Sequence, residues 1–204
     1  GEEILNADKE SLRKIRGNKI SMIFQEPMTS LNPYHRVGDQ IVESIQLHKK
    51  QPKSDAILEA KNLMNLVEIS EVDRRFSSYP HELSGGQRQR IMIAMALANK
   101  PKLLIADEPT TALDVTIQAQ ILDLMTKLKA EVGMSILFIT HDLGLIKQFS
   151  NTVTVMQQGN VVEQGDTSSV FSNPQHSYTK KLINSEPSEK QDFLVAEDSI
   201  ITVK

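Results

Sequence analysis

Two short stretches of the chain hold residues whose types and spacing suit phosphate and metal chemistry. In the first, Ser84 and two glycines, Gly85 and Gly86, precede Gln87 and an Arg-Gln-Arg run. Glycine lets the backbone approach a ligand closely, and Ser is a good N-cap residue. A helix start offers free N–H groups and a partial positive charge, which together bind anions, phosphate above all. We therefore interpret Ser84–Gln87 as a phosphate-facing helix start.

The second stretch is the apolar run 103–106 followed by Asp107, Glu108 and Pro109. Such a run predicts a strand buried on both faces, and side chains at the carboxyl end of a parallel strand reach the ligand crevice. One carboxylate there can hold Mg²⁺, and a second can act as general base for an attacking water. The alternative is a pair of surface acids, which the apolar lead-in and the turn at Pro109 disfavour.

Two more polar residues follow predicted strands. His141 comes directly after the apolar stretch 135–140, where an imidazole could bond a terminal phosphate. Gln25 follows the β-prone stretch 19–24, where its amide could contact a metal or water. Each residue taken alone is more typical of a structural role. The phosphate-gripping motif Gly-x-x-x-x-Gly-Lys-Ser/Thr occurs nowhere in the 204 residues.

Elements of alternating type are predicted around these residues. Residues 36–80 show helical spacing of apolar residues and no convincing strand, whereas an α/β pattern follows from residue 84. Its strand–helix–strand order implies parallel strands with right-handed crossovers. The predicted elements are a helix at 86–99, a strand at 102–106, a helix across 117–128 that ends at Gly133, a strand at 135–140, a helix at 141–149, and a hairpin of 153–157 with 160–164.

Charge and composition exclude several classes of protein. With 23 basic and 26 acidic residues the net charge is −3, so there is no electrostatic case for nucleic-acid binding. No apolar run approaches the ~18 residues that a membrane span needs. Cysteine is absent, which excludes a disulfide framework and a thiolate metal site and fits a cytosolic protein.

The order of these motifs resembles that of the ABC-transporter ATPases. Leu83–Gln87 resembles their signature motif and Leu103–Glu108 their Walker B strand. Gln25 then matches the Q-loop, Ala112-Leu113-Asp114 the D-loop, and His141 the switch histidine. The resemblance extends from residue 19 to about residue 184.

Two segments resemble one subfamily, the oligopeptide/dipeptide-type importers. Gln25–Pro33 is similar to their Q-loop, and Asn173–Thr179 to their C-terminal segment. Many single-domain relatives carry a cysteine cluster further on, and this chain has none. That absence agrees with tandem members, in which two ATPase domains share a chain, as in microcin C-type importers.

The resemblance implies a fold and a set of domain boundaries. The fold would be α/β, a P-loop NTPase-like ABC ATPase core of mostly parallel sheet with flanking helices, lacking the N-terminal part that carries the P-loop. Residues 1–184 would form this partial ATPase domain, with an α-helical subdomain inserted at about 30–98. Residues 185–198 would be a linker. Ser199–Lys204 would be either the first strand of a second ABC domain or an edge strand of this domain.

It also implies a role for each matching residue. In this family two domains sandwich ATP head to tail, so that the signature of one faces the nucleotide of the other. The catalytic residues would be Glu108, as general base, and His141, which would contact the γ-phosphate. Asp107 and Gln25 would serve Mg²⁺. The residues that contact nucleotide would be Ser84, Gly85, Gly86, Gln87, Gln25 and Asp114, the last of them from the dimer interface.

The implied function is that of an ATP-hydrolysing subunit that powers import of peptides or peptide-like solutes. Its partners would be a second ABC ATPase domain and transmembrane permease subunits, at the cytoplasmic face of the membrane and without nucleic acid. This chain by itself would bind ATP weakly. One alternative is a non-catalytic scaffold or regulatory module, against which Glu108 and His141 argue. Another is a soluble repair or translation ATPase, which the loop at 25–33 disfavours.

Overall fold

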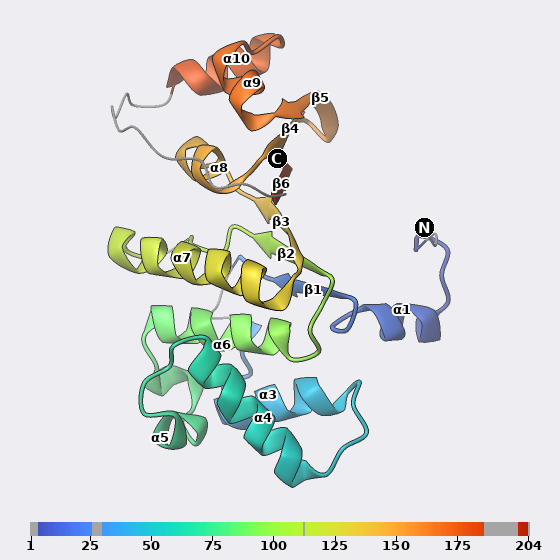
Figure 1. Cartoon of the computed structure of the whole chain (residues 1–204), viewed down its shortest axis with the longest axis vertical. Helices are drawn as coiled ribbons and strands as arrows, with labels where there is room; N and C mark the ends of the chain where they lie inside the picture. Colours follow the sequence, from blue (N-terminus) through green and yellow to red (C-terminus); the bar gives the residue numbers. More distant parts are fainter. Residues whose placement is uncertain (1–3, 26–29, 112, 186–199, 204) are drawn as a thin grey trace. The chain divides into compact units, whose positions relative to one another are not determined.

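The computed structural model describes residues 4–25, 30–111, 113–185 and 200–203. The chain forms two compact units (Figure 1). The first comprises Gly1–Leu104 and Pro109–Met134, and the second comprises Ile105–Glu108 and Ser135–Lys204. Of the residues predicted to form the Q-loop and D-loop, 26–29 and 112 lie outside the described residues, as does the predicted linker from residue 186 onward.

The first unit is built around one helix that is buried on nearly all sides. This helix, α6 (Gly85–Leu97), packs against α3, α4, α7 and β1. Its buried residues include Ile91, Ile93 and Leu97. Its second half, residues 91–97, is apolar on every side, as expected of a helix in the centre of a core. The remaining elements of the unit are α1 (Lys9–Ile15), β1 (Ile20–Ile23), α3 (Val37–Gln46), α4 (Lys53–Leu66), α5 (Val72–Phe76), the 3₁₀ helix Pro80–Glu82, the first residues of β2 (Leu103–Asp107), and α7 (Val115–Val132).

The helical segment predicted for residues 36–80 is confirmed. Helices α3, α4 and α5 pack against one another, and no strand is found among residues 36–80, all of which the structure describes. Helix α7 is also confirmed, with Ile121, Leu124 and Leu128 buried along one face. It ends at Gly133, whose φ of +68° is the left-handed conformation that glycine adopts readily.

The second unit is a sheet with three helices. Its strands follow the order β2-β3-β6-β4-β5. The predicted hairpin is present, because β4 and β5 are antiparallel and joined through Gln158 and Gly159, both at positive φ as tight hairpin turns require. The elements are the end of β2, β3 (Ser135–Ile139), α8 (Leu143–Phe149), β4 (Thr152–Gln157), β5 (Asn160–Asp166), α9 (Thr167–Ser172), α10 (Ser177–Ser185) and β6 (Ile200–Val203).

Two details of this unit differ from the sequence-based expectation. The helix predicted from residue 141 begins at Leu143, because the Asp142 side chain accepts hydrogen bonds from the N–H groups of Gly144 and Leu145 and so caps it. Strand β6 is an interior strand, parallel to both β3 and β4, and not an edge strand. Its assignment to a second domain stays a prediction.

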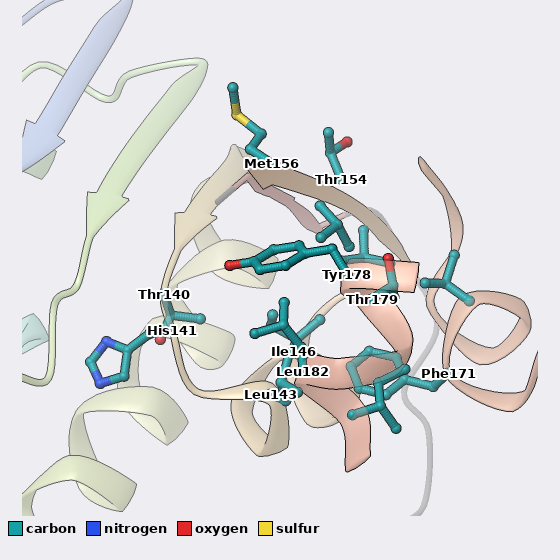
Figure 2. A pocket seen from close by; sticks show the side chains of 14 residues that line it. Thr140, His141, Leu143, Ile146, Thr154, Met156, Phe171, Tyr178, Thr179 and Leu182 are labelled. Carbon is teal, nitrogen blue, oxygen red and sulfur yellow. The ribbon is translucent and has the colours of Figure 1, made fainter. Parts of the chain in front are cut away.

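An apolar cluster fills the space between β4 and the helices α8, α9 and α10. Ile146, Val153, Val155 and Val170 form its buried centre. A cavity of about 110 Å³ remains beside them, lined also by Tyr178 and Leu182. Figure 2 shows Ile146, Tyr178 and Leu182 gathered there, while the His141 ring extends away from them. The imidazole is therefore presented at the end of β3 and is not part of the apolar core.

Candidate functional site

The structure brings Glu108 and His141 together in the second unit. Glu108 directly follows β2 and His141 lies two residues beyond β3, its neighbour in the sheet. The His141 Nδ1 atom lies 2.8 Å from Glu108 Oε1. When the carboxylate is ionised it can only accept a hydrogen bond, and the ring nitrogen is then the donor. The result is a carboxylate whose position is set by an imidazole, both of which can take up a proton.

Their exposure differs in a way that suits this arrangement. The Glu108 side chain is 16% exposed, whereas that of His141 is 62% exposed. The carboxylate is therefore held mostly away from solvent while the ring remains accessible to a ligand. The sequence predicted that His141 reaches the same edge of the sheet as Glu108, but it did not predict that the two side chains pair.

The backbone at Glu108 is strained. Its φ is +43°, a conformation that is uncommon for residues other than glycine. The Glu108 N–H donates to the carbonyl oxygen of Ile139 at 2.8 Å, which ties the turn after β2 to the last residue of β3. Such strain costs on the order of 1–3 kcal/mol, and it persists only where the surrounding structure enforces it. Residues held in this way cluster at functional sites.

Asp107 is the last residue of β2 and is half-buried. In the described part of the chain, no three His, Cys, Asp or Glu side chains gather as a ready-made metal site. Magnesium rarely uses an all-protein cage, and it takes oxygen ligands from one or two carboxylates, water and substrate phosphates. The carboxylate of Asp107 and the amide oxygen of Gln25 are ligands of that kind.

The start of α6 forms in the first unit as the sequence predicted. Ser84 is the N-cap, and its Oγ accepts a hydrogen bond from the Gln87 N–H at 3.3 Å. The Gln87 Oε1 in turn accepts from the Ser84 N–H at 3.1 Å, which completes a capping box. The Ser84 hydroxyl keeps its own proton for donation.

The two glycines of this helix start lie against the beginning of α7. A Cβ on Gly86 would come within 2.7 Å of Ile117 Cγ2, closer than side chains tolerate. A Cβ on Gly85 would meet Leu113 Cδ2 at an ordinary 3.4 Å. Gly86 is thus required by close packing of α6 on α7, a reason that differs from the close approach to a ligand expected from the sequence.

Asp114 lies at the start of α7, the helix against which Gly86 packs. It is the N-cap of α7, and its Oδ1 accepts a hydrogen bond from the Ile117 N–H at 2.9 Å. Gln25 lies two residues beyond β1 and is exposed. The predicted residues therefore divide between the units: Glu108, His141 and Asp107 in the second, and Ser84, Gly85, Gly86, Gln87, Asp114 and Gln25 in the first.

One polar residue near these motifs was missed. Gln89 is 1% exposed, and its Nε2 donates to the carbonyl oxygen of Pro109 at 2.5 Å. A signal was available, because Gln89 precedes the buried residues Met92 and Ile93 by three and four positions and so lies on an apolar stripe of α6. A buried amide on such a stripe needs a hydrogen-bond partner.

Comparison with known families agrees with the geometry. The sequence model described as "ABC transporter" matches residues 1–111, more than half of the 204-residue chain. The chain belongs to the ABC transporter family. A second model, described as "Oligopeptide/dipeptide transporter, C-terminal region", matches residues 162–197 of this ABC protein.

Curated ABC proteins of similar sequence carry names from peptide and peptidoglycan transport. The chain is 56% identical over 187 residues to "Peptidoglycan transport ATP-binding protein YejF" of Agrobacterium fabrum, covering 92% of this chain and 34% of that protein. It is 51% identical over 191 residues to "Probable peptide ABC transporter ATP-binding protein y4tR" of Sinorhizobium fredii, covering 94% and 57%. The chain thus spans about a third to just over half of these relatives.

Solved ABC structures share the fold. The "Dimeric structure of a post-hydrolysis state of the ATP-binding cassette MJ0796 bound to ADP and Pi" is 30% identical, with a TM-score of 0.69 over 79% of this chain and 68% of that one. The fold is therefore the predicted ABC ATPase core with an α-helical subdomain. In the part of the chain that the structure describes, no helix combines the length and apolar character that crossing a bilayer requires.

Proposed function

We propose that this chain is part of an ATP-hydrolysing ABC subunit that powers import of peptides or peptide-like solutes. The observation that carries the proposal is the Glu108–His141 hydrogen bond at the ends of two neighbouring strands. A module without catalysis has no need to hold a carboxylate in a strained backbone conformation beside an imidazole. The peptide part of the proposal is supported by the match at residues 162–197 and by the names of the relatives.

In the proposed mechanism Glu108 is the general base. Its carboxylate takes the proton of the water that attacks the γ-phosphate. His141 holds this carboxylate from Nδ1, and in its charged form it can also donate from Nε2 to a phosphate oxygen. Asp107 would hold Mg²⁺ through its carboxylate, and Gln25 stays a predicted ligand that rests on the family resemblance alone. When bound, the ion would neutralise charge on the phosphates.

The helix start at Ser84 would serve the nucleotide of a partner. Its free N–H groups and the Ser84 hydroxyl suit a terminal phosphate, and Gly85, Gly86 and Gln87 complete that surface. Asp114 would line the interface, because it caps the helix against which Gly86 packs. A head-to-tail arrangement of two ABC domains would place this surface opposite a partner's ATP, at the cytoplasmic face of a membrane permease.

Replacing Glu108 by Gln in the full-length ATPase tests the catalytic assignment. The amide keeps the shape of the side chain and can still bond His141, but it cannot accept the proton of the attacking water. We expect ATP binding to persist and hydrolysis to slow by about 10²–10⁴-fold, the usual contribution of a general base. Single-turnover assays with radiolabelled ATP measure both quantities.

Glu131→Gln is the matched control, since Glu131 is an exposed carboxylate near the end of α7 and outside every motif. It should hydrolyse ATP at the unaltered rate. Unchanged turnover in Glu108→Gln would remove Glu108 from this role. A full-length protein that binds ATP and never turns it over would favour the non-catalytic scaffold.

A further inference from the structure

A buried amide side chain connects α6 to the turn after β2. Gln89 on α6 is 1% exposed, and its Nε2 donates to the Pro109 carbonyl oxygen at 2.5 Å. Burying an amide without a hydrogen-bond partner destabilises a fold, because the amide loses its hydrogen bonds to water. A Leu or Met would fill the same position on the apolar stripe without that cost. The side chain is therefore specified by its hydrogen bond and not by burial.

The Pro109 carbonyl belongs to the turn that carries Glu108. Proline has no N–H, so the carbonyl is its single backbone group for a hydrogen bond. On the other side of Glu108, the Glu108 N–H donates to the Ile139 carbonyl at 2.8 Å. Two hydrogen bonds thus bracket the residue with φ +43°, and neither of them touches its carboxylate.

The geometry points to Gln89 as a positioning residue for Glu108. It holds the Pro109–Thr110 peptide, one residue beyond Glu108, and so restrains the turn that carries the carboxylate. This inference rests on the proposed role of Glu108 as general base. Because Gln89 is carried by the helix that begins at Ser84, the same bond ties the phosphate-facing helix start to that turn.

The test uses Gln89→Met in the full-length ATPase. Methionine matches the length of the side chain and removes the donor, so the Pro109 carbonyl is released. A displacement of about 1 Å in a catalytic group can cost about 10²-fold in rate. We expect kcat to fall about 10- to 100-fold while KM for ATP changes less than about twofold.

Asn99→Leu is the matched control. Asn99 follows α6 in the same unit, and its Nδ2 donates to the carbonyl oxygens of Gly17 and Ser44, each at 2.9 Å. It too is an amide bonded to backbone carbonyls, but it lies away from the motifs. We expect both variants to lower the melting temperature, and only Gln89→Met to lower kcat. An equal loss of kcat in Asn99→Leu would overturn the inference.

A second variant, Gln89→Glu, gives a readout that lost packing would not produce. A protonated carboxyl can donate to the Pro109 carbonyl as the amide does, whereas the ionised form can only accept. The kcat of Gln89→Glu relative to the unaltered enzyme should therefore rise as pH falls. A flat ratio would contradict the inference, and this series decides the matter if Gln89→Met does not fold.

The outcomes separate this inference from the proposed function. Slow turnover in Glu108→Gln with full kcat in Gln89→Met would overturn only the role of Gln89. Unchanged turnover in Glu108→Gln would overturn the proposed mechanism itself. A rise in KM without a change in kcat in Gln89→Met would assign the residue to binding and would also overturn its positioning role.

Discussion

The positions of Glu108 and His141 are set by where two strands, β2 and β3, end. Both were predicted at one edge of the sheet, because apolar runs at 103–106 and 135–140 precede them. The structure adds the 2.8 Å hydrogen bond and the positive φ of Glu108. Neither could be predicted, since a turn's dihedral angle and a side-chain contact arise from how separate strands pack.

Gly86 offers a prediction at the same scale. We expect Gly86→Ala to destabilise the fold by about 1–3 kcal/mol, the usual cost of overpacking, because its Cβ would lie 2.7 Å from Ile117 Cγ2. Gly85→Ala should be milder, since its nearest contact is an ordinary 3.4 Å. Urea unfolding curves measure both free energies.

A double substitution isolates the cause. Ile117→Ala removes the clashing methyl groups, so the combined Gly86→Ala and Ile117→Ala change should cost less than the sum of the single changes. Strict additivity would show that the two residues do not meet, and would leave the close packing of α6 on α7 unsupported.

At the scale of elements, an ion pair connects α6 to the loop after α4. The Arg90 Nη1 donates to Glu68 Oε2 at 3.0 Å and to the Val67 carbonyl oxygen at 2.9 Å. The Arg90 guanidinium holds the pKa of Glu68 below its ordinary value of 4.5, with a further contribution from Lys127. The pair could not be predicted, because the two residues lie 22 positions apart in the sequence.

This pair predicts a pH-dependent contribution to stability. A carboxyl whose pKa is lowered by folding stabilises the fold above its ordinary pKa, and this contribution disappears as pH falls through the lowered value. Glu68→Gln should therefore be less stable than the unaltered chain at pH 7, and the difference should be smaller at a pH below 4.5. The Glu68 side chain is 50% exposed, so we expect a difference of only about 0.5 kcal/mol in urea unfolding.

Glu10→Gln provides the comparison for this experiment. Glu10 and Lys14 form an i,i+4 pair at 2.8 Å whose side chains are 79% and 71% exposed. Solvent screens such a pair strongly, so its removal should hardly change stability at either pH. A larger pH effect in Glu10→Gln than in Glu68→Gln would contradict the role given to Arg90.

The types of the elements were predictable where periodicity was strong, as in α7 with its apolar face and its Gly133 end. The start of α8 was missed by two residues, because Asp142 acts as a cap and not as part of the helix. Cap and helix share the same sequence signal, and only the backbone angles distinguish them.

For the whole molecule, the missing Gly-x-x-x-x-Gly-Lys-Ser/Thr motif leads to a prediction. Without its lysine and backbone N–H groups, these 204 residues should bind Mg-ATP more weakly than a Kd of about 1 mM. Isothermal titration of the isolated chain measures this. A complete ABC cassette that carries the motif should bind under the same conditions, and tight binding by the isolated chain would refute the expectation.

The arrangement of the whole sheet was only partly predictable. The α/β order and the hairpin followed from apolar periodicity, but the place of Ile200–Val203 between β3 and β4 did not. A four-residue β-prone segment fits several positions in a sheet, and its own sequence does not choose among them.

Helix α6 has a mechanical consequence. Its 13 residues make a rod about 20 Å long, with no proline and with both glycines in its first turn. Close packing against α3, α4 and α7 leaves little room for it to bend. We therefore expect a force applied at Ser84 to move the helix as a rigid body, so that a displacement of its first turn along the helix axis produces an equal displacement of its last turn.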